Sequence, residues 1–234
     1  MRRVAIFVEG QAELIFVREF LLKWHSYDVD LECRALRGGN VPHPVDYDYP
    51  NNFAPLHFQL ISVGTDVAVL SQILRHEQRL YNAGYESIVG LRDMFSEDYI
   101  KIVKNRSVNQ TENENFYSGA LATIQAKAFQ ATKIKLCFAI MELEAWWIGI
   151  PSLWKGIDNT IKKQHQTSFE EPESIFHPAV FVDQLFQAQQ STYKKKKGEV
   201  ESIVGRISRE DYVELLGSQR CPSFCEFVQH LHLQ

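Results

Sequence analysis

The sequence predicts an α/β fold, with a mainly parallel central sheet flanked by helices and a C-terminal helical region. Two observations lead to this expectation. Apolar runs of strand length alternate with segments of helical periodicity up to about residue 150. Beyond that point the chain is polar with helical patterns, and prolines separate the expected helices. We therefore expect an α/β domain over 1–150, with a helical region over 151–234 packed on it.

Individual elements follow from the periodicity of the apolar residues. A short continuous run of apolar residues bounded by turn residues indicates a buried strand. Apolar residues that recur every three to four positions indicate a helix. Caps such as Thr65 and stops such as Gly84 bound the helices. The expected helices are 11–25, 65–84 and 113–131. The expected strands are 2–9, 29–37, 58–64, 85–93 and 133–147.

Composition limits the classes of protein that the chain can belong to. Of its 234 residues, 45% are hydrophobic, as in ordinary globular proteins with a core. We expect no signal peptide, because the apolar run after Arg2 and Arg3 is short and is soon interrupted by Glu9. We expect no membrane span, since the longest apolar run contains Glu142 and Glu144. The four scattered cysteines form no disulfide framework or zinc motif, which favours the cytoplasm. The net charge of −4 means that a nucleic-acid partner would need a local basic patch.

Three of the expected strands end in acidic residues. Glu9 follows the first strand, Asp93 ends the strand over 85–93, and Glu142 with Glu144 closes the last one. Parallel strands bring their carboxyl ends to one edge of a sheet, where active sites lie. Residues two apart on a strand face the same side, so we expect Glu142 and Glu144 to point together. Clustered carboxylates repel each other unless a cation lies among them, and Mg²⁺ or Mn²⁺ prefers such oxygen ligands.

A simpler interpretation applies to each acid taken alone. Strand ends often carry an aspartate or glutamate that caps a helix or faces water. Three acids at corresponding strand ends favour the metal-site interpretation over this one.

The motifs also resemble a known family. The segments "VEGQAE" and "IVGLRDMF" resemble the two acidic motifs of the TOPRIM (topoisomerase–primase) fold, which also occurs in OLD-type nucleases. In order, "VEGQAE", "GLRD", "MELEAWW", "EEPESIFHP", "TYKKKKG" and "CPSFCEF" resemble a small stand-alone bacterial TOPRIM-like family over nearly the whole chain. This resemblance implies a Rossmann-like TOPRIM domain. It also implies a metal-dependent activity on nucleic acid, a role in antiphage defence and an ABC-type ATPase as partner.

The resemblance assigns roles to matching positions. Glu9 corresponds to a metal ligand or general acid/base, and Asp93 to the first acid of an Asp-x-Asp metal motif. The sequence departs from that motif, because Phe95 stands where the second acid is expected. The missing ligand would then come from Asp98, or from the pair Glu142 and Glu144.

Other candidate residues have two interpretations each. The lysine run 194–197 could grip a phosphodiester backbone, or it could be a solvated loop. The relatives place a lysine after the same tyrosine, which makes Lys195 or Lys196 the candidate to reach the site. Glu13 is a second candidate for the general base. Trp146 and Trp147 could stack on bases, although core packing is the expectation we favour.

These observations give two hypotheses. The first is a Mg²⁺- or Mn²⁺-dependent TOPRIM-type nuclease that hydrolyses phosphodiester bonds in DNA or RNA. The alternative is a catalytically degenerate TOPRIM domain that acts as a binding or regulatory subunit, which Phe95 favours. The sequence leaves the oligomeric state open.

Overall fold

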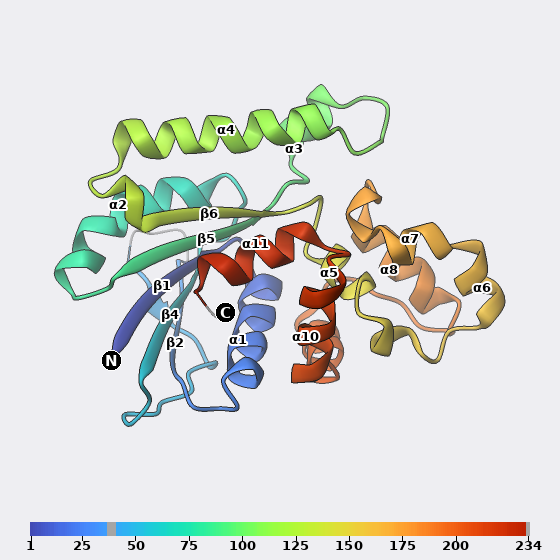
Figure 1. Cartoon of the computed structure of the whole chain (residues 1–234), viewed down its shortest axis with the longest axis horizontal. Helices are drawn as coiled ribbons and strands as arrows, with labels where there is room; N and C mark the ends of the chain where they lie inside the picture. Colours follow the sequence, from blue (N-terminus) through green and yellow to red (C-terminus); the bar gives the residue numbers. More distant parts are fainter. Residues whose placement is uncertain (37–40, 233–234) are drawn as a thin grey trace. The chain divides into compact units, whose positions relative to one another are not determined.

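The structure is a computed structural model that describes residues 1–36 and 41–232 of the chain. It confirms the α/β class, with a six-stranded, mostly parallel sheet flanked by helices and further helices toward the C-terminus (Figure 1). The strands are β1 (Arg2–Val8), β2 (Asp30–Ala35), β3 (His43–Pro44), β4 (Leu56–Ser62), β5 (Ser87–Asp93) and β6 (Ile134–Ala139). They lie in the order β3-β2-β4-β1-β5-β6. The last position of the strand expected over 29–37 lies outside the described residues.

Register fixes the direction of the central strands. β1 pairs in parallel with β4 and with β5, and β2 pairs in parallel with β4. Only the pairing of β2 with the short β3 is antiparallel among the registers of the described strands. Val8 at the end of β1 lies opposite Leu91 in β5, so these two strands point the same way, as the sequence predicts.

The helices include the three expected from periodicity. They are α1 (Gln11–Trp24), α2 (Ala68–Asn82), α3 (Glu97–Ile102), α4 (Gln110–Lys127), α5 (Glu144–Ile148), α6 (Asn159–Gln164), α7 (Gln166–Glu170), α8 (Pro178–Gln187), α9 (Lys197–Gly205), α10 (Arg209–Ser218) and α11 (Pro222–His230). Three single turns of 3₁₀-helix are η1 (Ala131–Lys133), η2 (Pro151–Trp154) and η3 (Pro172–Ser174). None of the helices formed by the described residues combines the length and apolar character needed to cross a bilayer.

The chain divides into two compact units. The first contains Met1–Arg92, Glu114–Cys137 and the residues from Phe227 to the C-terminus, and the second contains Asp93–Asn113 and Phe138–Glu226. Both units combine segments that are distant in sequence, and the domain boundary expected at residue 150 stays a prediction. A compact unit is defined by neighbours in space, and segments distant in sequence return to the same unit.

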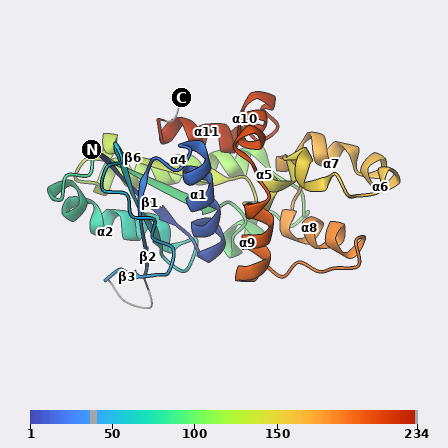
Figure 2. The same cartoon turned by 90° about the horizontal axis from the view of Figure 1, so that it is seen from below.

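In the first unit, α1 and α2 pack on opposite faces of the sheet (Figure 2). His25, just after α1, places its ring 5.9 Å from that of Phe58 in β4. His76 in α2 lies 6.2 Å from Phe7 in β1, centroid to centroid. Phe58 is opposite Val4 in the register, and Val4 and Phe7 point to opposite faces because side chains alternate along a strand.

A glycine allows α2 to approach the sheet. A Cβ atom on Gly90 in β5 would lie 2.5 Å from Cδ1 of Leu136 and 2.7 Å from Cδ1 of Ile73 in α2. Real Cβ atoms essentially never come this close to a neighbour, so the side chains of Leu136 and Ile73 would have to shift if a larger residue replaced Gly90.

The last strand is shorter than the sequence predicts. β6 ends at Ala139, and the expectation of a strand through 147 is therefore wrong. Met141 adopts a positive φ of 63°, which extended backbone does not allow, and Glu144 already begins α5. Both acids of "MELEAWW" consequently lie beyond the strand.

The second unit is built around α5. Trp146 and Trp147 are fully buried, which confirms the core interpretation of these two side chains. The indole Nε1 of Trp146 donates a hydrogen bond to Ser223 Oγ at 2.8 Å. α5 packs against α8, so this short helix is held by its neighbours rather than by its own propensity.

Candidate active site

Two buried carboxylates share one ammonium group in the second unit. The Nζ atom of Lys195 lies 3.5 Å from Oδ2 of Asp93 and 3.4 Å from Oε1 of Glu144. The Glu144 side chain is 0% exposed and that of Asp93 is 7% exposed, whereas Lys195 is 33% exposed. We call these three residues the acidic cluster. Charges this well buried must be paired, and here the lysine pairs with both acids.

Asp93 is fixed by its position at the end of β5. Its Oδ1 atom accepts a hydrogen bond from the backbone N–H of Leu143 at 3.0 Å. The backbone after Asp93 is also hydrogen-bonded to the segment after β6: Met94 N donates to Ala139 O, and Phe95 N donates to Met141 O. The turn after β6 is thereby tied to Asp93, and this turn positions the start of α5.

Glu144 occupies the first turn of α5, where a negative charge interacts favourably with the helix dipole. The hydroxyl group of Tyr193 donates a hydrogen bond to Glu144 Oε1 at 2.6 Å. Tyr193 is itself buried and packs edge-on against Trp147, with 5.8 Å between ring centroids. The sequence pattern did not predict this role for Tyr193, although the residue immediately precedes the lysine run 194–197.

Lys195 is the member of the lysine run that reaches the acids. Its backbone has a φ of 53°, which is costly for a residue with a side chain and persists where the surroundings enforce it. The N–H groups of Lys194 and Lys196 both donate to Oε2 of Glu199, at 2.7 and 3.2 Å. These bonds brace the backbone on both sides of Lys195. Lys196 itself is exposed and stands just before α9.

Glu142 points elsewhere, so the expectation that it would face the same side as Glu144 is wrong. Its Oε2 atom accepts hydrogen bonds from the backbone N–H of Ala179 at 2.9 Å and faces Nδ1 of His177 at 2.8 Å. Glu142 thus secures the N-terminus of α8. The alternation argument fails because the two acids stand outside the strand.

The two residues considered for the Asp-x-Asp motif have structural surroundings of their own. Phe95 packs on Phe176 and His177, with ring centroids 5.5 and 4.4 Å away. Asp98 lies in the first turn of α3, is exposed and pairs with Lys101 at 3.2 Å. Asp98 thus forms an exposed ion pair within α3, and that it supplies a metal ligand stays a prediction.

Glu9 and Glu13 belong to the first unit. Glu9 follows β1, and its carbonyl oxygen accepts a hydrogen bond from Gly64 N at 2.7 Å. Glu13 is buried, and its Oε2 atom accepts a bond from Gly10 N at 2.9 Å, which satisfies a backbone donor at the start of α1. That Glu9 or Glu13 joins the acidic cluster stays a prediction.

The acidic cluster has a donor set that suits a hard divalent cation. Mg²⁺ in proteins is commonly held by one or two carboxylates, with water and substrate phosphate as further ligands. Asp93 and Glu144 already turn toward one positive charge, that of Lys195. No group of three or more histidine, cysteine, aspartate or glutamate side chains with metal-ligand spacing occurs among residues 1–36 and 41–232. Asp93 and Glu144 are the two residues of the acidic cluster that could hold a metal.

Comparisons with known proteins assign no family to the chain. No protein-family model, curated protein or solved structure matches it. The resemblance to TOPRIM proteins thus rests on the motifs alone.

Proposed function

We propose that the protein is a Mg²⁺- or Mn²⁺-dependent nuclease of the TOPRIM type that hydrolyses phosphodiester bonds. One observation carries this proposal: the buried carboxylates of Asp93 and Glu144 face the same cation, the ammonium group of Lys195. Retaining two buried acids close together has a cost, which a cation-dependent reaction would explain.

Each residue of the cluster has a separate task in this proposal. Asp93 and Glu144 would hold the metal, which when bound polarises the phosphate and lowers the pKa of an attacking water. Tyr193 keeps Glu144 in one orientation through its 2.6 Å hydrogen bond. Lys195, a third exposed, turns toward the phosphate and offsets the negative charge that develops there.

Other parts of the proposal come from the resemblance. Glu9 would act as a further ligand or as the general base. The substrate would be DNA or RNA, and an ABC-type ATPase would be the partner in an antiphage role. We place the reaction in the cytoplasm, consistent with four free cysteines.

A second candidate function is a degenerate TOPRIM domain that binds a partner without catalysis. Lys195 already balances part of the charge of the two acids, and Phe95 is packed among aromatic rings where a second acid would be expected. In that case Lys195 is a permanent substitute for the metal.

Metal titration with cleavage assays separates the two functions. We expect Mn²⁺ binding by calorimetry, and cleavage of single-stranded DNA, double-stranded DNA or structured RNA. Asp93→Asn and Glu144→Gln should each reduce cleavage by about 100-fold or more, since a metal ligand contributes several kcal/mol to charge stabilisation. Both variants keep the shape of the side chain, so folding is checked by circular dichroism.

Asp98→Asn is the matched control, because it removes the same charge from an exposed position nearby in sequence. It should leave metal binding and cleavage unchanged. Absence of both metal binding and cleavage in the wild type would overturn the nuclease and favour the degenerate domain. Cleavage that survives Asp93→Asn would place the activity elsewhere.

A further inference from the structure

One face of the sheet in the first unit carries polar side chains on two neighbouring strands. Parallel sheets covered by helices on both faces normally read as continuous apolar runs. In β2 and β4 the residues alternate instead, and the apolar positions Leu31, Cys33, Phe58 and Leu60 are buried. The polar residues between them share the opposite face, because their Cα atoms are paired in register: Asp30 with His57, and Glu32 with Gln59. The polar side chains of this face must form hydrogen bonds or ion pairs where they are shielded from water.

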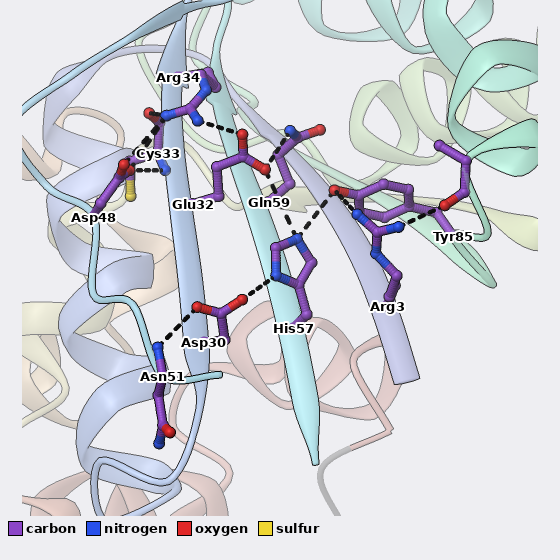
Figure 3. A network of polar contacts seen from close by, with 11 residues as sticks. Arg3, Asp30, Glu32, Cys33, Arg34, Asp48, Asn51, His57, Gln59 and Tyr85 are labelled. Carbon is purple, nitrogen blue, oxygen red and sulfur yellow. Dashed lines mark hydrogen bonds and ion pairs between the residues drawn. The ribbon is translucent and has the colours of Figure 1, made fainter. Parts of the chain in front are cut away.

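Part of the need is met by a network across three strands (Figure 3). The imidazole of His57 contacts Asp30 Oδ2 through Nδ1 at 2.5 Å and the hydroxyl of Tyr85 through Nε2 at 3.1 Å. Arg3 reaches Tyr85 OH at 3.3 Å and lies over the tyrosine ring, 4.4 Å from its centroid. The guanidinium group of Arg3 is thus held in a fixed orientation.

Glu32 is matched within the same network. Gln59 Nε2 donates to Glu32 Oε2 at 2.8 Å, and Arg34 forms an ion pair with the other carboxylate oxygen. Arg34 also lies 3.3 Å from Asp48 Oδ1. The only carboxylate that lines the adjacent cavity is therefore already neutralised, among the residues described.

A cavity of about 260 Å³ opens beside this network. Three arginines line it, Arg3, Arg34 and Arg79, against the single carboxylate of Glu32. Arg79, in the last turn of α2, is exposed, and its guanidinium group has no hydrogen-bond or ion-pair partner among residues 1–36 and 41–232. The lining thus carries a surplus of positive charge in a concave site.

His76 provides an independent indication of a ligand. It lines the cavity, is only 8% exposed, and its Nε2 atom has no hydrogen-bond partner within the described part of the chain. Buried polar atoms are nearly always paired, so this one requires explanation. Burial, followed by the charges of Arg79 and Arg75, lowers the pKa of His76. The ring is therefore neutral at pH 7 and has one N–H that can be donated to an oxygen.

We propose that this cavity binds a small phosphomonoester. The phosphate dianion would match the surplus of two positive charges, with Arg79 and the imidazole of His76 as donors and Arg3 and Arg34 beside them. A single water molecule needs about 10–15 Å³ of such volume, and the cavity offers about 260 Å³. The cavity is therefore large enough for a phosphate with an organic group attached. The site lies wholly within the first unit and is independent of the nuclease proposal.

Calorimetric titration in chloride buffer tests the site, with inorganic phosphate and ribose 5-phosphate as probes. We expect saturable binding of both, with ribose 5-phosphate the tighter because its sugar occupies the rest of the cavity. Arg79→Gln should weaken both by about tenfold or more, the usual effect of losing a charged hydrogen bond. Arg75→Gln is the control, since it removes the same charge one turn earlier on α2 outside the cavity lining.

His76→Leu is a second variant that distinguishes binding from folding. It removes the unpaired nitrogen, so thermal stability in chloride should be unchanged or higher, while phosphate affinity falls. Failure of both probes to bind at millimolar concentration would overturn the proposal. An equal loss in Arg75→Gln and Arg79→Gln would do so too, because it would indicate general electrostatic attraction rather than a site.

Discussion

The two units differ in how the charged side chains of their candidate sites are paired. In the acidic cluster of the second unit, two carboxylates converge on one lysine, and every charge has a partner. In the cavity of the first unit, three arginines face one neutralised carboxylate, and His76 has a nitrogen without a partner among the described residues. Both acids of the acidic cluster already contact Lys195, so a metal ion would have to compete with this lysine. The cavity has more positively charged hydrogen-bond donors than carboxylates, so an anion would balance its charge.

The largest expected effect comes from removing the lysine that satisfies the acidic cluster. Lys195→Met leaves two buried carboxylates without a cation and should lower the free energy of unfolding by about 2 kcal/mol in EDTA, less than for a wholly buried pair because Lys195 is partly exposed. Urea unfolding monitored by circular dichroism measures this loss.

Added Mg²⁺ then tests whether the cluster accepts a metal. It should stabilise Lys195→Met more than the wild type, because the ion replaces the missing charge. Lys196→Met is the control, since that side chain is exposed and should change stability little. A variant that loses stability and gains nothing from Mg²⁺ would identify a purely structural ion pair.

A second prediction concerns the packing that shapes the cavity. Gly90→Ala places a methyl group against Leu136 and Ile73 and should destabilise the fold by about 1–2 kcal/mol. Because α2 carries Arg79 and His76, its displacement should also weaken phosphate binding. Gly119→Ala in α4 meets nothing within 4 Å and should instead raise stability. Equal effects of the two changes in thermal melts would contradict the close approach of α2.

A third prediction contrasts the acidic cluster with Glu173, an acid that has no cationic partner among the described residues. Burial raises the pKa of Glu173 from 4.5 to about 7, against the hydrogen bonds it accepts from Ser223. Between pH 4.5 and 7 the folded state therefore binds a proton that the unfolded state has released. Stability from this group is fully present below pH 4.5 and is lost as pH rises to 7, by about 1–2 kcal/mol after allowance for partial exposure.

Glu173→Gln should abolish this part of the pH dependence, because its amide does not ionise. Urea midpoints at pH 5 and pH 8 measure the difference between variant and wild type. Glu171→Gln, at an exposed neighbouring position, should retain the wild-type slope. Identical slopes for wild type and Glu173→Gln would mean that Glu173 is ionised throughout.

Local patterns in the sequence determined the α/β class, the parallel direction of β1 and β5, and the helices α1, α2 and α4. These features follow from apolar periodicity, which is a property of consecutive residues. The expectation that a lysine of the run 194–197 approaches an acidic site agrees with the position of Lys195.

Tertiary structure decided which acids share a site. Glu142 and Glu144 are two residues apart, yet one secures α8 and the other faces Lys195. Their directions depend on where β6 ends and α5 begins, and the turn between them is held by the hydrogen bond that the backbone N–H of Leu143 donates to the Asp93 carboxylate. Tyr193 binds Glu144, which is distant in sequence, and the cavity is lined by arginines from separate segments of the chain. Such partners become neighbours only when the chain has folded, so no local pattern specifies them.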